Sequence, residues 1–312
     1  MKVLMLGSQK KYRGSGKGYS TIWNEEFFRE ELARRVDINF SGWGYDPEWS
    51  GNRNISEMIE RFGKPDVIIN HYHRENYKGL GNVKNILKVW IAGDFYDENW
   101  RFSSYLKHAK INNYDISCGY SPYIVGHLKK YNVGEKQYTL TWGVDTYVHR
   151  DLKIPRIIDV SAIYSPVSRR GGSHVYPLRS KIHEMLRNMS DINTYTENTF
   201  FDDYVLKLNQ SKISVNDNSY FKFVNPRATE VMSCGTFYLT DGNSDFKELG
   251  YENGKHLVFY DGIDDLKEKI FYYLDHEEER KEIAENGRVF VRENYSNRCR
   301  AERLLSIIKE NL

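Results

Sequence analysis

Residues 225–241 read NPRATEVMSCGTFYLTD, a helix start followed closely by a strand. Pro226 suits the first position of a helix, because its fixed backbone angle matches the helix and its missing N–H is not needed there. The run Thr236–Thr240 then predicts a strand. Arg227 and Glu230 are three residues apart, so both lie on one face of the helix. This stretch therefore predicts one helix and one strand of an α/β fold, with a cation and a carboxylate near the helix start.

Strands and helices alternate in the same way along the rest of the chain. Short apolar and β-branched runs predict further strands at Val3–Leu6, Ile38–Phe40, Asp66–Asn70, Val89–Ala92, Tyr138–Thr141, Ile157–Ile163, Lys212–Val215 and His256–Tyr260. Helices are expected at Thr21–Arg35, with Trp23, Phe27 and Leu32 facing inward, and at Ile55–Phe62, Ser121–Tyr131, Pro177–Met189 and within Ile263–Leu312. This alternation predicts parallel sheets covered by helices on both faces. The polar stretch Trp142–Pro155 interrupts it, which predicts two domains, 1–148 and 149–312.

The composition is typical of a soluble globular protein. Of 312 residues, 40% are hydrophobic and 28% are charged, and the formal net charge is +2. This balance excludes a polybasic protein and an acidic disordered tail, but it allows a local basic groove. Three cysteines without a CxxC pattern argue against a disulfide framework and a cysteine-bound zinc, and they favour a reducing compartment. The apolar run Val3–Leu6 is too short for a signal peptide, so a cytoplasmic location is expected.

The segment Gly7–Gly18 is a glycine-rich loop after the first expected strand. It lacks the glycine spacing of a Walker P-loop, and Gly18 stands where such a loop carries Ser or Thr. Two interpretations stay open. The segment is either a mobile loop or a loop that closes over a ligand and brings Gly16 to it.

Two strands of the first half end in side chains that can do chemistry. Asp94 follows the strand Val89–Ala92, where a carboxylate can act as a general base, or it caps the next turn. His71 and His73 follow the strand Asp66–Asn70, but no third ligand lies nearby, so no metal site is expected. His71 is then either a contact in a ligand cleft or a structural surface histidine.

The N-terminus of the helix that begins at Pro226 suits a phosphate, because its free N–H groups and the helix dipole favour an anion. Arg227 can grip a diphosphate while Glu230 accepts hydrogen bonds from the hydroxyls of a neighbouring ribose. The alternative is an ordinary salt bridge between these two side chains on a solvated face.

Further cations follow the strand Ile157–Ile163, namely Arg169, Arg170 and Arg179. No DxD motif occurs in a suitable loop, so metal-bridged binding of a diphosphate has no support in the sequence. Arginines are therefore expected to neutralise the diphosphate in a site without a metal.

Together with the preceding Arg227 and Glu230, residues 231–241 resemble the donor-binding helix and strand of GT-B glycosyltransferases, most closely the CgeB-type group. The segments HLVFYD at 256–261 and IAENG at 283–287 continue the resemblance, which extends over about residues 142–305. It implies a GT-B fold, with two Rossmann-like domains whose parallel sheets face a central cleft. The C-terminal domain would bind a nucleotide-sugar donor and the N-terminal domain the acceptor, and the last helix would cross back to the N-terminal domain.

The chain also resembles the phage DNA β-glucosyltransferases, in its Arg-x-x-Glu helix, its arginine-containing loop and the aspartate that closes an apolar strand. By that resemblance, Glu230 holds the ribose hydroxyls. Arg227, Arg179 and one of Arg169 and Arg170 hold the diphosphate.

The resemblance also assigns catalysis. Asp94 would deprotonate the acceptor hydroxyl in an inverting displacement. Lys222 stands where retaining GT-B enzymes carry a glutamate, which favours inversion. His71, however, resembles the strand-end histidine of those retaining enzymes, and this resemblance favours retention.

The activity expected from these residues is hexosyl or pentosyl transfer from a nucleotide-diphosphate sugar, most simply of the UDP type, with no cofactor. The acceptor is either a surface glycan or protein, or hydroxymethylated DNA. Basic and aromatic residues favour DNA, although the near-neutral net charge favours a solvated loop instead: Lys10, Lys11, Tyr12, Arg13, Lys17 and Tyr19. The rival interpretation is a non-catalytic nucleotide- or nucleic-acid-binding protein on the same scaffold.

Overall fold

The computed structural model describes residues 1–7, 21–42, 44–45, 52–71, 76–97, 99, 101–165, 177–218 and 223–312. These residues form two compact units. The first unit takes the described residues within Met1–Ser15, Glu25–Thr141 and Arg300–Leu312, and the second takes those within Gly16–Asn24 and Trp142–Cys299.

The first unit is built on a six-stranded sheet with the order β2-β1-β4-β6-β7-β8, in which every neighbouring pair is parallel. Its strands are β1 (Lys2–Leu6), β2 (Asp37–Ser41), β4 (Val67–His71), β6 (Leu87–Ile91), β7 (Ile116–Gly119) and β8 (Lys136–Thr139). Leu6 is in register with Ser41 and Asn70, and His71 with Ile91, so these strands end at one edge. A separate parallel pair joins β3 (Asn52–Asn54) and β5 (Asn76–Lys78).

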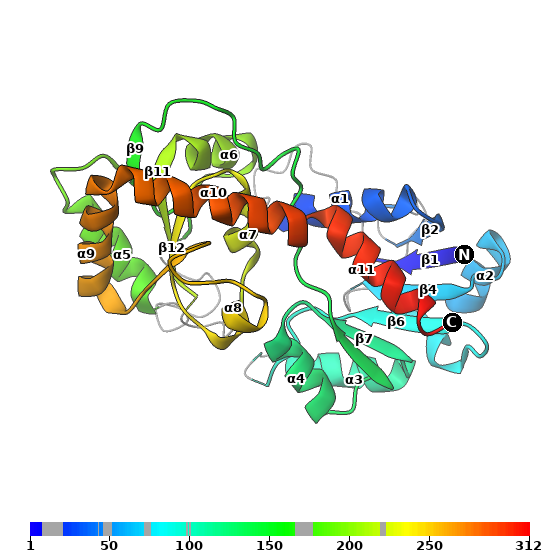
Figure 1. Cartoon of the computed structure of the whole chain (residues 1–312). Coiled ribbons are helices and arrows are strands. Elements are labelled where there is room, and N and C mark those ends of the chain that lie inside the picture. The colour runs from blue at the N-terminus through cyan, green and yellow to red at the C-terminus, as the bar shows by residue number, and fades with distance from the viewer. Residues whose placement is uncertain are drawn as a thin grey trace. The chain divides into compact units, whose positions relative to one another are not determined.

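Helices pack on this sheet, and two of them share one core with its strands (Figure 1). The helices are α1 (Thr21–Ala33), α2 (Ile55–Phe62), α3 (Phe102–Asn112), α4 (Pro122–Lys130) and α11 (Asn297–Lys309), with a short 3-10 turn at Leu80–Asn82. The core joins Phe28 and Leu32 of α1 to Leu304 and Ile308 of α11. Phe27, expected to face inward, is only half-buried. Phe28 takes that place because it lies four residues from Leu32, and residues at that spacing lie above one another on a helix.

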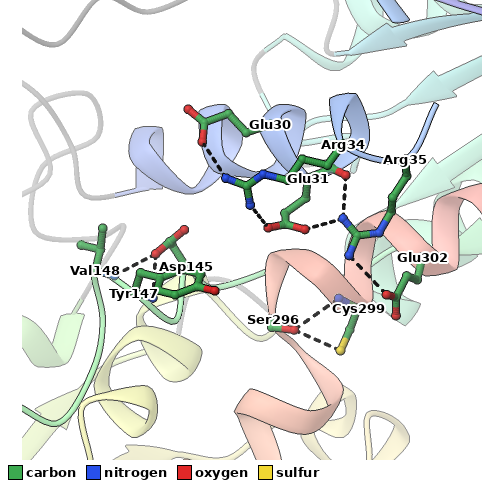
Figure 2. A network of polar contacts seen from close by, with 10 residues as sticks. All are labelled: Glu30, Glu31, Arg34, Arg35, Asp145, Tyr147, Val148, Ser296, Cys299 and Glu302. Carbon is green, nitrogen blue, oxygen red and sulfur yellow. Dashed lines mark hydrogen bonds and ion pairs between the residues drawn. The ribbon is translucent and has the colours of Figure 1, made fainter. Parts of the chain in front are cut away.

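An ion pair also joins the turn after α1 to α11 at the surface (Figure 2). Glu31 pairs with both Arg34 and Arg35, and Arg35 Nη2 lies 3.3 Å from Glu302 Oε1 on α11. Exposed pairs of this kind contribute at most about 1 kcal/mol each. The shared apolar core is therefore the main attachment of α11 to the first unit.

The second unit is built on a five-stranded parallel sheet with the order β10-β9-β11-β12-β13. Its strands are β9 (Ile158–Ser161), β10 (Thr194–Tyr195), β11 (Ser211–Asn216), β12 (Phe237–Asp241) and β13 (Val258–Tyr260). Its helices are α5 (Pro177–Arg187), α6 (Phe201–Gln210), α7 (Pro226–Ser233), α8 (Ser244–Glu248), α9 (Gly262–Asp275) and α10 (Glu277–Asn294). One apolar core contains α5 and α9, and another contains α6, α7 and α8 (Figure 1). Helices thus cover both faces of the sheet, as the alternation predicted.

A partly buried arginine contacts the end of α7. The guanidinium of Arg156 donates to the carbonyls of Cys234 and Gly235 at the end of α7, at 2.9 and 2.8 Å, and to Ser211 O at 2.7 Å. Gly235 has a φ of 67°, a left-handed conformation that glycine adopts without strain. These bonds satisfy carbonyls that would otherwise lack partners at the helix end. These hydrogen bonds tie the end of α7, the helix that carries Arg227 and Glu230, to the residue at the start of β11.

No helix in the described parts of the chain is long and apolar enough to span a membrane.

Candidate active site

Polar and aromatic side chains gather where the strands of the second sheet end. Tyr164 follows β9, Asn216 to Asn218 end and follow β11, and Asp241 ends β12. The strands are parallel and aligned, with Ser214 opposite Ser161 and Asn216 opposite Thr240. Ligands bind at such an edge in open α/β sheets.

Two arginines lie against one aromatic ring at this edge. The guanidinium carbon of Arg179, in the first turn of α5, lies 4.9 Å from the centroid of the Tyr164 ring, and that of Arg227, in α7, lies 5.8 Å from it. Tyr164 is 1% exposed. Arg179 Nη2 donates to the Asp217 carbonyl at 3.5 Å, and Arg227 Nη1 donates to Asn216 Oδ1 at 3.4 Å. Two cations held together in this way, one beside a helix N-terminus, are chemically suited to bind a phosphate or diphosphate.

An asparagine network positions the start of α7. Asn225 caps the helix, and its Oδ1 accepts from Arg227 N at 3.0 Å. Asn218 Oδ1 accepts from the side-chain amides of Asn225 and Asn216, and Asn218 Nδ2 donates to Thr240 Oγ1 at 2.8 Å. The helix cap is therefore tied to the ends of both β11 and β12. This network fixes where Arg227 lies relative to the sheet edge.

Acidic groups lie near the two arginines. Burial raises the pKa of Asp241 to about 6; the hydrogen bond from Asn218 N to its Oδ1, at 2.5 Å, opposes the rise, and the charge of Asp217 adds to it. The charges of Arg179, Arg227, Asp217 and Asp241 all act on the Tyr164 hydroxyl. Protonation of Asp241 removes one negative charge from this region. Binding of a diphosphate here is therefore expected to strengthen as the pH falls through about 6.

Glu230 lies one helical turn after Arg227, and it is buried. Glu230 is 1% exposed, and its Oε2 accepts a hydrogen bond from the Tyr204 hydroxyl at 3.0 Å. Tyr204 lies on α6 and is also buried. The alternative of a salt bridge on a solvated face is therefore wrong for this helix, because Glu230 is buried.

Asp94 lies at the corresponding edge of the first sheet. It follows β6 by three residues and is exposed. The buried Tyr120, just after β7, donates a hydrogen bond from its hydroxyl to Asp94 Oδ1, and Asn99 Nδ2 donates to the Asp94 carbonyl at 2.7 Å. The carboxylate is thus held at a strand end and open to solvent, as a base acting on an acceptor hydroxyl must be.

His71 ends β4, but its side chain is fully buried. Its Nε2 lies 2.7 Å from Glu25 Oε2, and its Nδ1 lies 3.3 Å from Arg29 Nη2. Glu25 Oε1 in turn lies 2.9 Å from Arg300 Nη1 of α11. Burial lowers the pKa of His71 to about 4, although Glu25 opposes this change. The interpretation of His71 as a surface histidine is wrong, because a neutral imidazole with both nitrogens facing partners lies inside the first unit.

Several predicted site residues lie outside the described residues. These are Gly16, Arg169 and Arg170, together with Lys222 and the basic and aromatic residues of the 10–19 segment. Within the parts of the chain that are described, no group of three or more His, Cys, Asp or Glu side chains is arranged to hold a metal ion.

Sequence reasoning missed the residues that orient the predicted ones. Tyr164 follows a predicted strand, and Asp217 and Asp241 lie at the ends of two others, so their positions at strand ends could have indicated them. Tyr120 and Tyr204 carry no such signal, because each meets its carboxylate partner across 26 residues of sequence.

Solved structures share this fold over the whole chain. HepE from Anabaena in complex with UDP matches with a TM-score of 0.69 and 12% identity, over 99% of this chain and 100% of that one. Sucrose-phosphate synthase from Thermosynechococcus elongatus matches with a TM-score of 0.70 and 12% identity, over 99% and 98%. An α-glucosyltransferase in complex with UDP and a 13-mer DNA matches with a TM-score of 0.61 and 11% identity, over 99% and 100%. The chain therefore has the GT-B fold of glycosyltransferases, which confirms the predicted fold class.

The sequence comparisons point the same way over part of the chain. Residues 179–306 match a protein family described as glycosyl transferase-like. This segment begins at Arg179 and contains Arg227 and Glu230. No curated protein matches the chain.

Proposed function

We propose that the protein is a glycosyltransferase that moves a hexosyl or pentosyl group from a nucleotide-diphosphate sugar to a hydroxyl acceptor. The observation that carries this proposal is the pair of guanidiniums, Arg179 and Arg227, on the Tyr164 ring at the edge of the second sheet. The fold and the family match support it. Within that class we place the chain near the CgeB-type group, and we take a UDP sugar as the donor.

Different residues are proposed to bind the diphosphate and the ribose of the donor. Arg179 and Arg227 bind the diphosphate, and Glu230 accepts hydrogen bonds from the ribose hydroxyls. As the sugar leaves, negative charge develops on the diphosphate, and fixed cations stabilise that charge in the transition state. The reaction then needs neither a metal nor another cofactor. Arg169, Arg170 and Gly16 are further candidates for donor contacts.

Asp94 is the proposed base of an inverting displacement. It takes the proton of the acceptor hydroxyl as the oxygen attacks the anomeric carbon, and the diphosphate leaves from the opposite face. His71, buried and neutral, is better suited to fix the end of β4 than to exchange protons with a substrate. Its assignment as a catalytic residue stays a prediction.

Two classes of acceptor are proposed, namely a surface glycan or protein and hydroxymethylated DNA. One of the structures of similar fold is an α-glucosyltransferase in complex with UDP and a 13-mer DNA containing an HMU base. Reactions with a radiolabelled donor and each acceptor class would distinguish them. A cytoplasmic location fits either acceptor and stays a prediction.

The test of the donor site is calorimetric titration with UDP, GDP, dTDP and CMP. We expect one nucleoside diphosphate to bind and Arg179→Ala to weaken it by about 10- to 100-fold, since hydrogen bonds to charged groups contribute about 1.5–3 kcal/mol. Arg187→Ala is the matched control, because Arg187 is exposed on the same helix, α5. Absence of binding by the wild-type protein would contradict the proposal.

The second candidate function is nucleotide binding without catalysis. It is favoured only by the contacts of the buried His71 with Glu25 and Arg29, which occupy a side chain otherwise predicted to be catalytic. A nucleotide-diphosphate sugar that binds, but is neither hydrolysed nor transferred to any acceptor offered, would support it. Measurable transfer would exclude it.

A further inference from the structure

A cavity lies at the edge of the second sheet opposite the candidate active site. It has a volume of about 520 Å³, within the range that holds small-molecule ligands. Arg156 lines it just before β9, Lys212 within β11 and Gly235 just before β12, so it lies where these strands begin. The candidate active site lies where the same strands end, and from Lys212 to Asn216 along β11 is about 13 Å. The cavity is therefore a separate place in the second unit.

Cationic side chains outnumber carboxylates in this cavity. Among the described residues that line it, five are cationic and three are acidic: Lys153, Arg156, Lys212, Arg280 and Lys281, with Asp151, Glu277 and Glu285. Each of the three carboxylates already lies within 2.7 Å of a lysine or arginine nitrogen. The lining thus carries an excess of positive charge, which favours an anion.

Arg280, at the end of the first turn of α10, has one edge of its guanidinium available. The residue is 5% exposed, and its Nη1 donates to the carbonyls of Tyr273 and Leu274 at the end of α9. Among the described residues, none accepts a hydrogen bond from its Nε or Nη2, and both atoms keep contact with solvent. Two parallel N–H groups on such an edge match two oxygens of a phosphate or carboxylate. Arg280 therefore offers a fork of donors to a ligand in the cavity.

The positive charge of Arg156 is not paired with a carboxylate. Within the described part of the chain, its guanidinium donates to four backbone carbonyls and one hydroxyl. Burial lowers the pKa of Arg156, and the charge of Arg280 lowers it further, while Asp151 opposes the change. Burial also lowers the pKa of Arg280, although Glu277 and Asp159 oppose this. A bound anion would stabilise the charged forms of both arginines.

Lys212 supplies a third cation. Its Nζ lies 2.6 Å from Asp159 Oδ1, and its side chain is partly exposed. The charge of Arg280 also acts on Asp159, so Lys212 and Arg280 lie near one carboxylate. An ammonium has three N–H donors, and Asp159 uses one of those on Lys212. The other two remain for a ligand.

We propose that this cavity binds the phosphate group of a small ligand, either inorganic phosphate or a phosphate monoester. Arg280 binds two phosphate oxygens through Nε and Nη2, and Lys212 binds a third. Arg156 contributes charge alone, because its Nη atoms already donate to the backbone. A phosphate dianion gains more than a carboxylate from several cations, since the attraction scales with its charge. This inference does not depend on the proposed function, because the two sites share no residue.

The experiment is calorimetric titration of the full-length protein with inorganic phosphate and with glycerol 3-phosphate. Wild type and Arg179→Ala are both titrated, so that phosphate bound at the candidate active site is recognised, and binding is expected to persist in Arg179→Ala. Arg280→Lys keeps the charge but removes the fork, so it should weaken binding by about 10- to 100-fold. Lys212→Gln, a change at a partly exposed position, should weaken it by about 3- to 10-fold. Lys267→Gln is the matched control, because this exposed lysine of α9 does not line the cavity, and it should bind as wild type does.

Each outcome has a distinct meaning. Equal affinities in wild type, Arg280→Lys and Lys212→Gln would overturn the inference, as would loss of all phosphate binding in Arg179→Ala. Dissociation constants above about 10 mM for both ligands would overturn it too. Tighter binding of glycerol 3-phosphate than of phosphate, weakened in Arg280→Lys, would support an organic phosphate, and equal binding would support inorganic phosphate. A protein that binds phosphate here but no nucleotide would contradict the proposed function and leave this inference standing.

Discussion

At the scale of single residues, Tyr164 is the side chain that gathers the charges of the donor site. Its ring lies within 6 Å of two guanidinium carbons that come from different helices. Each cation–π contact contributes about 0.5–2 kcal/mol when it is shielded from water. The ring also limits the rotamers of two long side chains that would otherwise lose more entropy on binding an anion.

Replacing Tyr164 tests this role. Tyr164→Leu is expected to lower the affinity for the bound nucleoside diphosphate by about 3- to 30-fold, because both cation–π contacts are lost. Tyr164→Phe keeps the aromatic face and should bind almost as well as wild type. Calorimetric titration measures both. Equal losses in the two variants would mean that the hydroxyl, and not the ring, matters.

Asp94 is the residue on which the proposed mechanism depends. Asp94→Asn is expected to lower kcat by about 100- to 10,000-fold, the usual range for loss of a general base, with nucleotide affinity unchanged. Tyr120→Phe should lower kcat by about tenfold, because the carboxylate loses the hydrogen bond that orients it. Turnover of the donor with a defined acceptor provides the measurement. An Asp94→Asn variant with full turnover would remove Asp94 from the role of base.

At the scale of elements, α1, β4 and α11 meet in a buried group of charges. Glu25 of α1 lies between His71 of β4 and Arg300 of α11, and the Arg300 guanidinium carbon lies 4.2 Å from the centroid of the Phe28 ring. These residues are distant in sequence but are adjacent in the first unit. The group favours one register of the last helix, because the charge of Arg300 stabilises the Glu25 carboxylate more than those of His71 and Arg29 do.

Disrupting this group of charges is expected to lower the stability of the fold. Arg300→Met should lower the free energy of unfolding by about 3–5 kcal/mol, because Glu25 keeps a buried charge without its arginine. Chemical denaturation measures the loss, and the double variant Glu25→Gln with Arg300→Met should recover part of it. Arg35→Ala is the control, since the Arg35–Glu302 pair between the turn after α1 and α11 is partly exposed and should contribute less than about 1 kcal/mol (Figure 2). Similar losses in the two single variants would contradict this account.

The elements themselves were largely predictable from local pattern. The strands β4, β6, β9, β11 and β12 lie at their predicted positions with ends that move by a few residues, because β-branched and aromatic runs between turn signals mark buried strands. The strand β7 was missed, since its sequence ISCG has few β-forming residues and is extended only by pairing with β6 and β8. The helices α3 and α6 were missed as well.

At the scale of the whole molecule, acidification is expected to weaken the fold in both units. Burial lowers the pKa of His71, His108 and His183 from the ordinary value of 6.5 to about 4. Between these values the unfolded chain binds more protons than the folded one. The stability that depends on these neutral histidines is therefore fully present above pH 6.5 and is lost as the pH falls toward 4. The fully buried His71 and His183 would each contribute about 2 kcal/mol of loss by pH 5.

Urea denaturation at pH 7.5 and pH 5 tests this expectation. The midpoint is expected to fall at pH 5, although Asp241 opposes the trend, because its pKa is raised to about 6 and its protonation relieves a buried charge. His183→Phe keeps a ring beside Tyr164 and removes one titrating group, so its midpoint should depend less on pH than that of wild type. A midpoint that does not change with pH in wild type would show that these histidines are protonated in the folded state.

The sequence by itself determined the alternation of strands and helices, the α/β class, and the helix start that carries Arg227 and Glu230. Signals of this kind act over four or five residues, through helix spacing, strand alternation and capping, and they can be read from a single chain. Only the tertiary structure decided which side chains meet: Arg179 and Arg227 on Tyr164, Tyr204 on Glu230, and Arg300 on Glu25 across 275 positions. Such contacts depend on strand order, register and helix packing, which many residues set together and no local pattern records.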